Sequence, residues 1–234
     1  MLWGYDLDIW QREHVLYPLR TSLSDYTNVL FNGSSGSGKS MAVLFALSQL
    51  EPCEIFFLDF KGDYPELMST NNYYSGDDVI SALVDYHAEF QAIRRGDLKQ
   101  EKRRLLVIEE YASLVNYLPK KDSEQVKSIV QTLLMLGRGT GLGHNTWIVC
   151  QRSDSSILPG GGKLNMHVIM LLGNASPVDW SVCLSGIEQP KRTFQRSQGC
   201  IWIDGRGLRN IIVPTIRSKE KMILQVEKHL NGNW

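Results

Sequence analysis

Three absences narrow the classes of protein that this 234-residue sequence can represent. The chain has only four cysteines and no C-x-x-C pair, which argues against a disulfide framework and indicates thiols in a reducing compartment. It has no apolar run near the roughly 20 residues needed to cross a bilayer, and its first residues lack the pattern of a signal peptide. It has no excess charge, with 25 basic and 25 acidic residues, so contact with nucleic acid would need a local patch. We therefore expect a globular, cytoplasmic chain.

The chain is long enough to bury a core, and 43% of its residues are hydrophobic. Apolar runs typical of buried strands alternate with amphipathic segments, which predicts an α/β fold with a mostly parallel sheet and helices on both faces. We expect one domain over residues 1–234, with a nucleotide-binding core in residues 26–234. Within residues 1–25, the stretches 7–10 and 15–19 predict one or two short strands. Residues 199–213 predict a β-hairpin that turns at residues 204–207. The other expected strands are residues 28–31, 53–60, 105–110, 146–150 and 168–172, and the expected helices are residues 39–50, 75–95, 122–136, 177–187 and 218–230.

Residues 31–41 read FNGSSGSGKSM and hold the spacing G-x-x-x-x-G-K-S between an apolar strand and an apolar helix. Small residues let backbone N–H groups converge on a phosphate, so this context predicts a loop that binds a nucleoside triphosphate. Lys39 is expected to reach the β- and γ-phosphates and Ser40 to bind Mg²⁺. A Gly/Ser linker is the alternative, which the flanking strand and helix argue against. The candidate binding residues are Gly33, Ser34, Ser35, Gly36, Ser37, Gly38, Lys39, Ser40 and Met41.

A second apolar strand, residues 105–110, ends in two acids. An acid at the end of a strand near a phosphate loop can hold the water shell of Mg²⁺, and a second acid can polarise the attacking water. We assign the first role to Glu109 and the second to Glu110. After the strand 146–150, Gln151 is a candidate to orient water and report the nucleotide state, with a solvent-facing strand end as the alternative.

Two polar segments allow more than one interpretation. Lys61 and Asp63 follow the strand 53–60 and lie either at the edge of the site or in a plain surface turn. Residues 94–104 hold six lysines and arginines and two acids. We favour a solvated, mobile connector over a nucleic-acid patch for this segment.

Taken together, the motifs resemble one family. GSSGSGKS, DFKGDY, LLVIEEYASL, GRGTGLGHNTWIVCQRSD and GCIWIDG followed by VPTI are similar, in this order, to segments of the RecA-like motor domain of the FtsK/SpoIIIE DNA translocases. That domain falls within a superfamily that includes HerA and the conjugative coupling proteins. The resemblance runs from about Leu2 to the C-terminus. It implies a RecA-like P-loop NTPase fold, ATP and Mg²⁺ as ligands, ATP hydrolysis, binding of double-stranded DNA without sequence preference, and a ring of six copies.

Residue by residue, the resemblance implies that residues 33–40 form the phosphate loop. It also makes Glu109 the Walker B acid, Glu110 the catalytic glutamate and Gln151 the sensor. Arg138 becomes the candidate finger that reaches a neighbouring subunit's γ-phosphate, with capping of the preceding helix as the alternative. The resemblance further implies a pore loop near DNA in the segment from Ser155 to Asn165, which includes Lys163.

The sequence departs from the family at three points. Glu109 stands where this branch usually has Asp, and Arg152 and Ser153 stand where Arg-Pro is common. The family's membrane anchor, second motor subdomain and winged-helix domain are not found, so we expect an excised motor domain or a compact relative. Membrane, relaxosome or secretion partners would then act through parts outside this chain.

The substrate of such a motor stays open at this point. DFKGDY is closer to the coupling proteins of mobile elements, which favours conjugative DNA transfer. One alternative is a protein-export ATPase of the type VII secretion kind, and another is an ATP-gated assembly module that does not hydrolyse. A GTPase is disfavoured because no N-K-x-D motif occurs.

Overall fold

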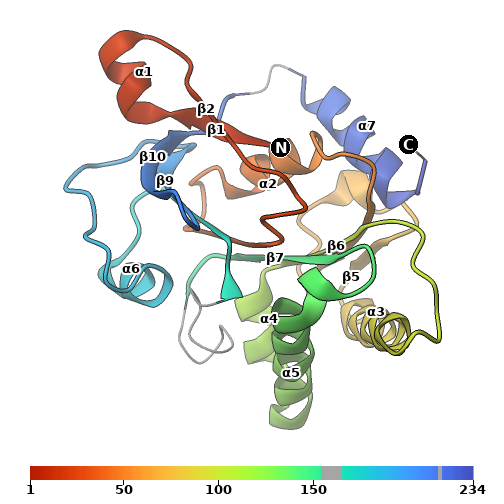
Figure 1. Ribbon diagram of the computed structural model, residues 1–234. Helices are drawn as coiled ribbons and strands as arrows, with labels where there is room; N and C mark the ends of the chain where they lie inside the picture. Colours follow the sequence, from red (N-terminus) through yellow and green to blue (C-terminus); the bar gives the residue numbers. More distant parts are fainter. Residues whose placement is uncertain (154–164, 216–217, 234) are drawn as a thin grey trace.

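The computed structural model describes residues 1–153, 165–215 and 218–233, and a single ten-stranded sheet runs through them (Figure 1). In chain order the strands are β1 (Leu2–Asp6), β2 (Pro18–Arg20), β3 (Asn28–Gly33), β4 (Glu54–Asp59), β5 (Tyr73–Ser75), β6 (Arg104–Glu109), β7 (His144–Cys150), β8 (Val168–Leu172), β9 (Gln198–Ile203) and β10 (Gly207–Ile212). Across the sheet they lie in the order β2-β1-β10-β9-β8-β3-β7-β6-β4-β5. From β8 to β5 all neighbours are parallel, whereas β9, β10, β1 and β2 join as antiparallel strands.

Helices cover both faces of this sheet. The helices are α1 (Leu7–Glu13), α2 (Lys39–Leu47), α3 (Asp78–Arg95), α4 (Tyr111–Tyr117), α5 (Lys120–Leu136), α6 (Pro177–Cys183) and α7 (Lys219–Leu230), with short 3-10 turns η1 (Pro65–Leu67) and η2 (Gly137–Gly139). Side chains of α2 and α7 pack in the core of one face, and those of α3, α4, α5 and α6 in the core of the other (Figure 1). The predicted α/β architecture is therefore confirmed. Throughout the described ranges, no helix has both the length and the apolar character needed to cross a membrane.

The central strands are apolar on both sides because each face is covered. In β3, Val29 and Phe31 belong to the core under α2 and α7, while Leu30 belongs to the opposite core. The rings of Trp3, Phe31 and Trp147 meet with centroids 5.5–6.0 Å apart, so aromatic packing joins the N-terminal strand to the middle of the sheet. Such double burial explains why these strands are continuous apolar runs and do not alternate with polar residues.

Several elements differ from the sequence prediction. Residues 1–25 contain two strands, but residues 7–10, which are expected to be strand, lie in helix α1. This helix begins where Asp6 Oδ1 accepts hydrogen bonds from the N–H groups of Asp8 and Ile9. The helix predicted over 177–187 ends at Cys183, and Gly186 follows in a left-handed conformation. Strands β9 and β10 form the predicted hairpin, with Ile203 opposite Gly207.

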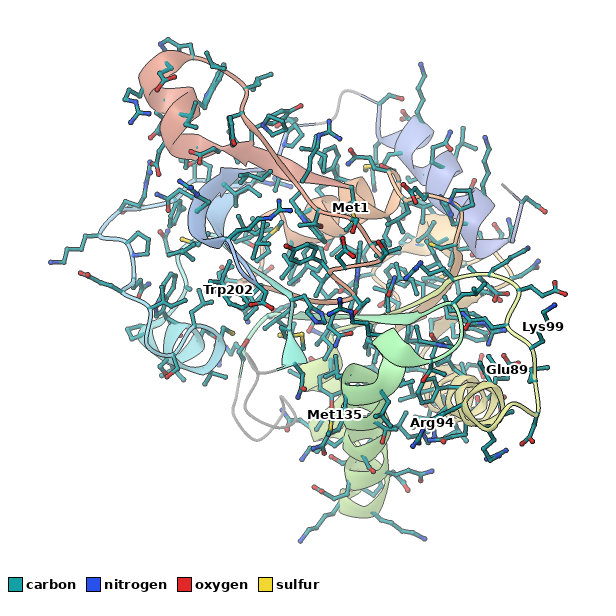
Figure 2. All side chains as sticks on the ribbon, viewed as in Figure 1. Met1, Glu89, Arg94, Lys99, Met135 and Trp202 are labelled. Atoms are coloured by element: carbon teal, nitrogen blue, oxygen red, sulfur yellow. The ribbon has the colours of Figure 1, made fainter. Side chains whose placement is uncertain are left out.

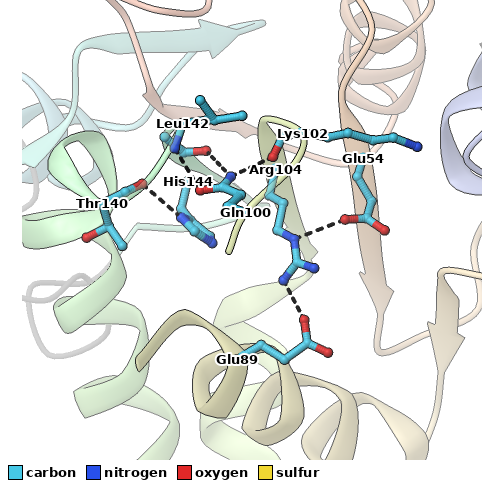
Figure 3. Close-up of polar contacts among 9 residues, drawn as sticks. Glu54, Glu89, Gln100, Lys102, Arg104, Thr140, Leu142 and His144 are labelled. Atoms are coloured by element: carbon cyan, nitrogen blue, oxygen red, sulfur yellow. Dashed lines mark hydrogen bonds and ion pairs between the residues drawn. The ribbon is translucent and has the colours of Figure 1, made fainter. Parts of the chain in front are cut away.

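Hydrogen bonds and ion pairs connect the basic segment 94–104 to neighbouring elements (Figure 3). Gln100 Nε2 donates to the backbone oxygens of Lys102 and Gly143, and Gln100 Oε1 accepts from the N–H of Leu142. Arg104 pairs with Glu54 and Glu89, and Arg95 pairs with Asp97. Arg94, in the last turn of α3, and Lys99, in the segment that follows, are exposed (Figure 2). Because acids offset part of its charge, the segment is better described as a connector than as a nucleic-acid patch.

Candidate functional site

The predicted phosphate loop joins β3 to α2 and depends on glycine at two positions. Gly38 has φ +97°, and a Cβ there would lie 2.7 Å from Ser197 Oγ. A Cβ on Gly33 would lie 2.6 Å from Ser37 Oγ and 2.7 Å from the backbone oxygen of Leu172. Real side chains do not tolerate such approaches, so both glycines are required by the packing around the loop.

A neighbouring segment supports the loop from outside. The N–H of Ser197, just before β9, donates to the backbone oxygen of Ser37 at 2.8 Å. Gly38 is the N-cap of α2 and supplies no side-chain hydrogen bond to the first turn. The N–H groups of that turn, together with the positive end of the helix dipole, are therefore available to an anion.

A cavity of about 190 Å³ lies over this loop. Its lining includes Gly36, Gly38, Lys39, Ser40 and Met41 as well as Ser34 and Ser35, and it also includes Asp63, Gln151 and Arg196. A second cavity of about 650 Å³ adjoins it and is lined by Gly33, Ser34, Ser35, Gln151 and residues 174–176 among others. Gln151 therefore lies at the boundary between the two cavities, beside the loop as expected. Asp63 lies at the edge of the site, and Arg196 is a lining residue that the sequence analysis missed.

The two predicted acids meet the loop from β6. Glu109 ends this strand, and Glu110 follows in a left-handed conformation with φ +53° before α4 begins. Both carboxylates are buried, and Glu110 Oε1 lies 3.7 Å from Lys39 Nζ. The structure thus brings Lys39, Glu109 and Glu110 together at the carboxyl ends of β3 and β6, where parallel sheets place their ligands.

Each acid has one oxygen that accepts a hydrogen bond and one that does not. Glu109 Oε1 accepts from the Tyr64 hydroxyl at 3.1 Å, and Glu110 Oε2 accepts from Lys61 Nζ at 3.0 Å and from Ser113 Oγ at 3.1 Å. Among the described residues, Glu109 Oε2 and Glu110 Oε1 are buried without a hydrogen-bond partner. Burial raises the pKa of Glu109 to about 8, opposed by the charge of Lys39 and reinforced by that of Glu110.

These donors fit a magnesium ion carried by a triphosphate. The Ser40 hydroxyl is exposed at the start of α2, and the free Glu109 Oε2 is an unsatisfied acceptor on the facing strand. Hydroxyl and carboxylate oxygens are ligands that Mg²⁺ prefers. A nearby dication also favours the ionised form of Glu109, against the effect of burial on its pKa.

Arg138 lies away from these groups. It sits in η2, before β7, whereas Gln151 follows the other end of β7, so the seven-residue strand separates them by roughly 20 Å. Its charge lowers the pKa of His167, the residue before β8, as a smaller effect than burial. Arg138 is exposed near the amino end of β7, whereas the phosphate loop lies at the carboxyl ends of the strands. It therefore cannot reach the nucleotide cavity of its own chain.

The helix-capping alternative for Arg138 gains no support. Thr140 Oγ1 donates to the backbone oxygen of Leu136 at the end of α5. Among the described residues, no hydrogen bond joins the Arg138 guanidinium to the last carbonyls of that helix. The predicted pore segment cannot be assessed, because residues 155–164, Lys163 included, lie outside the described residues.

Comparison with known proteins gives structural matches only. No protein-family model and no curated protein matches the sequence. The pCW3 conjugation coupling protein TcpA, solved as a monomer with ATPγS, superposes with a TM-score of 0.64 at 19% identity, over 90% of this chain and 64% of that one. The chain therefore has a RecA-like P-loop α/β fold.

Two secretion ATPases show the same fold. EssC (ATPases 2 and 3) from Geobacillus thermodenitrificans matches 98% of this chain and 47% of that one, with a TM-score of 0.68 at 14% identity. Thermomonospora curvata EccC (ATPases 2 and 3), solved with a signal sequence peptide, matches 93% and 41%, with a TM-score of 0.62 at 13% identity. The chain therefore spans less than two thirds of the length of each of these three proteins. At identities this low, the structural matches establish the RecA-like P-loop fold and nothing about activity or partners.

Proposed function

We propose that this chain is an ATP-hydrolysing motor domain of the FtsK type that moves DNA. One observation carries the proposal: Glu110 Oε1, which accepts no hydrogen bond among the described residues, is buried 3.7 Å from Nζ of the phosphate-loop lysine, Lys39. A free carboxylate oxygen at this place can accept a proton from a water that attacks the γ-phosphate. A purely structural carboxylate would have both oxygens satisfied.

The other residues take roles set by their positions. The loop N–H groups and Lys39 bind the phosphates, and Glu110 polarises the attacking water. Gln151, at the junction of the two cavities, orients that water. Ser40 and Glu109 hold the Mg²⁺ that arrives with ATP, which when bound neutralises charge on the phosphate oxygens.

Arg138 is proposed to act on a neighbouring subunit. Its exposed position on the edge opposite the phosphate loop suits a residue that completes the ATP site of the next copy in a ring. We propose a ring of six copies, with ATP at the subunit boundaries and the whole of residues 1–234 acting as one cytoplasmic motor domain. Membrane, relaxosome or secretion proteins are the proposed further partners.

DNA is the proposed substrate because the matching coupling protein belongs to a conjugation system and because DFKGDY resembles such proteins. Contact would be with phosphates, independent of sequence, and would weaken with salt. Protein export is the second candidate, favoured by the match to EccC in complex with a signal sequence peptide and by the TM-score of 0.68 for EssC.

ATPase rates measured against protein concentration test the proposal and separate the candidates. A DNA motor should hydrolyse faster with duplex DNA at low salt, lose that stimulation at high salt, and show a specific rate that rises with concentration as copies assemble. An exporter should ignore DNA and respond to a signal peptide. Absence of hydrolysis under all of these conditions would contradict the proposed activity and favour an ATP-gated assembly module.

A further inference from the structure

The turn that follows β4, residues 59–64, lies against the acid pair and is itself tightly held. Asp59, fully buried, accepts hydrogen bonds at Oδ1 from the N–H of Gly62 and at Oδ2 from the N–H of Tyr64 and the hydroxyl of Tyr73. Gly62 has φ +73°, a conformation that glycine adopts without strain. These contacts give the turn a single shape and fix the directions in which Lys61 and Tyr64 leave it.

The two side chains leave the turn toward different acids. Lys61 Nζ lies 3.0 Å from Glu110 Oε2, and the buried Tyr64 hydroxyl lies 3.1 Å from Glu109 Oε1. In each acid the other oxygen is the one without a hydrogen-bond partner among the described residues. The turn after β4 therefore restrains one oxygen of each carboxylate and leaves the second oxygen of each for other partners.

We propose that Lys61 and Tyr64 are positioning residues for ATP hydrolysis, Lys61 for Glu110 and Tyr64 for Glu109. This inference rests on the proposed function. With Oε2 held by Lys61 and Ser113, Glu110 can rotate little, and its Oε1 stays directed toward the phosphate loop. With Oε1 held by Tyr64, Glu109 presents Oε2 to the magnesium ion.

The ion pair between Lys61 and Glu110 does more than neutralise the buried carboxylate. Glu110 lies between two cations, with Lys39 Nζ 3.7 Å from Oε1 and Lys61 Nζ 3.0 Å from Oε2. A bound triphosphate competes for Lys39, which then interacts less with Glu110. Lys61 remains as the cation that keeps Glu110 in place when the water attacks the γ-phosphate. A misplacement of about 1 Å in such a group costs roughly 100-fold in rate.

The test of Lys61 separates turnover from binding. Lys61→Met removes the ammonium and keeps the length of the chain, and Lys61→Arg keeps a cation. We expect kcat to fall about 10- to 100-fold in Lys61→Met, with the dissociation constant for ATPγS within about 2-fold of wild type and partial recovery of kcat in Lys61→Arg. The matched control is Lys228→Met, an exposed lysine on α7, which should hydrolyse as wild type does.

Tyr64 is tested by metal affinity rather than by rate. Tyr64→Phe removes only the hydroxyl from a buried ring, so the fold should persist, as melting curves will report. We expect the Mg²⁺ concentration that half-saturates binding of fluorescent ADP to rise about 10- to 100-fold, as is typical when a hydrogen bond to a metal ligand is lost. Binding of the nucleotide without Mg²⁺ should not change.

The outcomes separate this inference from the proposed function. Wild-type rates in Lys61→Met, or a fall in kcat that Lys61→Arg does not restore at all, would overturn the role of Lys61. An unchanged Mg²⁺ requirement in Tyr64→Phe would overturn the role of Tyr64. Normal turnover in Glu110→Gln would remove Glu110 from the mechanism, and the role of Lys61 with it. No turnover by the wild-type chain would instead overturn the proposed function, and both positioning roles with it.

Discussion

Lys39, the first residue of α2, and Glu110, which follows β6, approach to 3.7 Å between Nζ and Oε1. Both side chains are buried, with 7% and 2% of their surfaces exposed. Neither residue is near the other in sequence, so their contact requires β3 and β6 to end at the same edge of the sheet. A nucleotide bound in the cavity above would contact both the cation and the carboxylate.

Removal of the Lys39 charge should abolish nucleotide binding. In Lys39→Ala the loop keeps its N–H groups but loses the cation that faces the cavity. We expect the affinity for ATPγS, measured by calorimetry, to fall by at least about 100-fold, which corresponds to roughly 2.7 kcal/mol. Lys120→Ala, at an exposed lysine on α5, serves as the control. Affinity within a few-fold of wild type in Lys39→Ala would place the nucleotide elsewhere.

Neutralisation of Glu110 should stop turnover without weakening binding. Glu110→Gln keeps the size of the side chain and its contact with Ser113, but an amide cannot take the proton of an attacking water. We expect kcat to fall about 100- to 10,000-fold, with ATPγS affinity equal to wild type or tighter. Glu101→Gln, on the exposed connector, should behave as wild type. Hydrolysis at the full rate in Glu110→Gln would remove this residue from the mechanism.

Much of the site follows from sequence because it lies where apolar strands end. The phosphate loop, the acid pair after β6, Gln151 after β7 and Asp63 after β4 all lie near the carboxyl edge of one parallel sheet. A mostly parallel α/β fold brings such residues together without further information. The order of the apolar runs along the chain is enough to predict that these residues meet at one edge of the sheet.

The partners of the acids could not be predicted in the same way. Whether Lys61 reaches Glu110, or Tyr64 reaches Glu109, depends on the exact course of a turn and on the left-handed backbone of Glu110. Arg196 lies in an irregular segment before β9 that carries no periodic pattern. The short helices α1 and α4 were missed because they are only seven residues long and lie directly after strands.

A methyl group at Gly38 should disable the phosphate loop. Gly38→Ala adds a Cβ 2.7 Å from Ser197 Oγ at a residue with φ +97°. We expect loss of ATPγS binding and a lower melting temperature. Gly232→Ala, at φ +69° with open space around the new atom, adds only backbone strain and should leave binding intact. Equal effects of the two substitutions would show that the contact with Ser197 does not matter.

Ser153 should contribute to stability as a buried hydrogen-bonding centre behind the loop. Its Oγ accepts from Asn32 Nδ2 at 2.7 Å and from Cys183 Sγ at 3.0 Å, and its N–H donates to Asp179 at 2.6 Å. Among the described residues, Ser153→Ala leaves Asn32 Nδ2 with only a long contact to Cys150 Sγ, at 3.7 Å. We expect a loss of about 1–3 kcal/mol in urea unfolding, against a negligible change for the exposed Ser128→Ala. A loss below about 0.5 kcal/mol would argue against this network.

Acid should destabilise the fold in part through His144. Burial among Tyr86 and Phe90 lowers its pKa from 6.5 to about 4. Because the folded pKa is the lower one, the contribution of His144 to stability is complete above pH 6.5 and is lost as the pH falls toward 4. The loss is on the order of 3 kcal/mol, at about 1.4 kcal/mol for each pKa unit.

The substitution His144→Phe isolates this effect. It removes the titrating ring and also a buried Nε2 that has no hydrogen-bond partner among the described residues. Unfolding measured by urea at several pH values should show a flatter dependence between pH 6.5 and 4 than in wild type. His14→Asn, at an exposed left-handed position that asparagine tolerates, serves as the control. An unchanged slope in His144→Phe would assign the acid sensitivity to other groups.

The most direct test of the site is a crystal structure of the chain with Mn²⁺ and ATPγS, with Mn²⁺ located by its anomalous scattering. The account predicts phosphates against the N–H groups of residues 34–40 and one Mn²⁺ peak between Ser40 Oγ and Glu109. A nucleotide bound elsewhere, or a metal peak remote from these two residues, would contradict it.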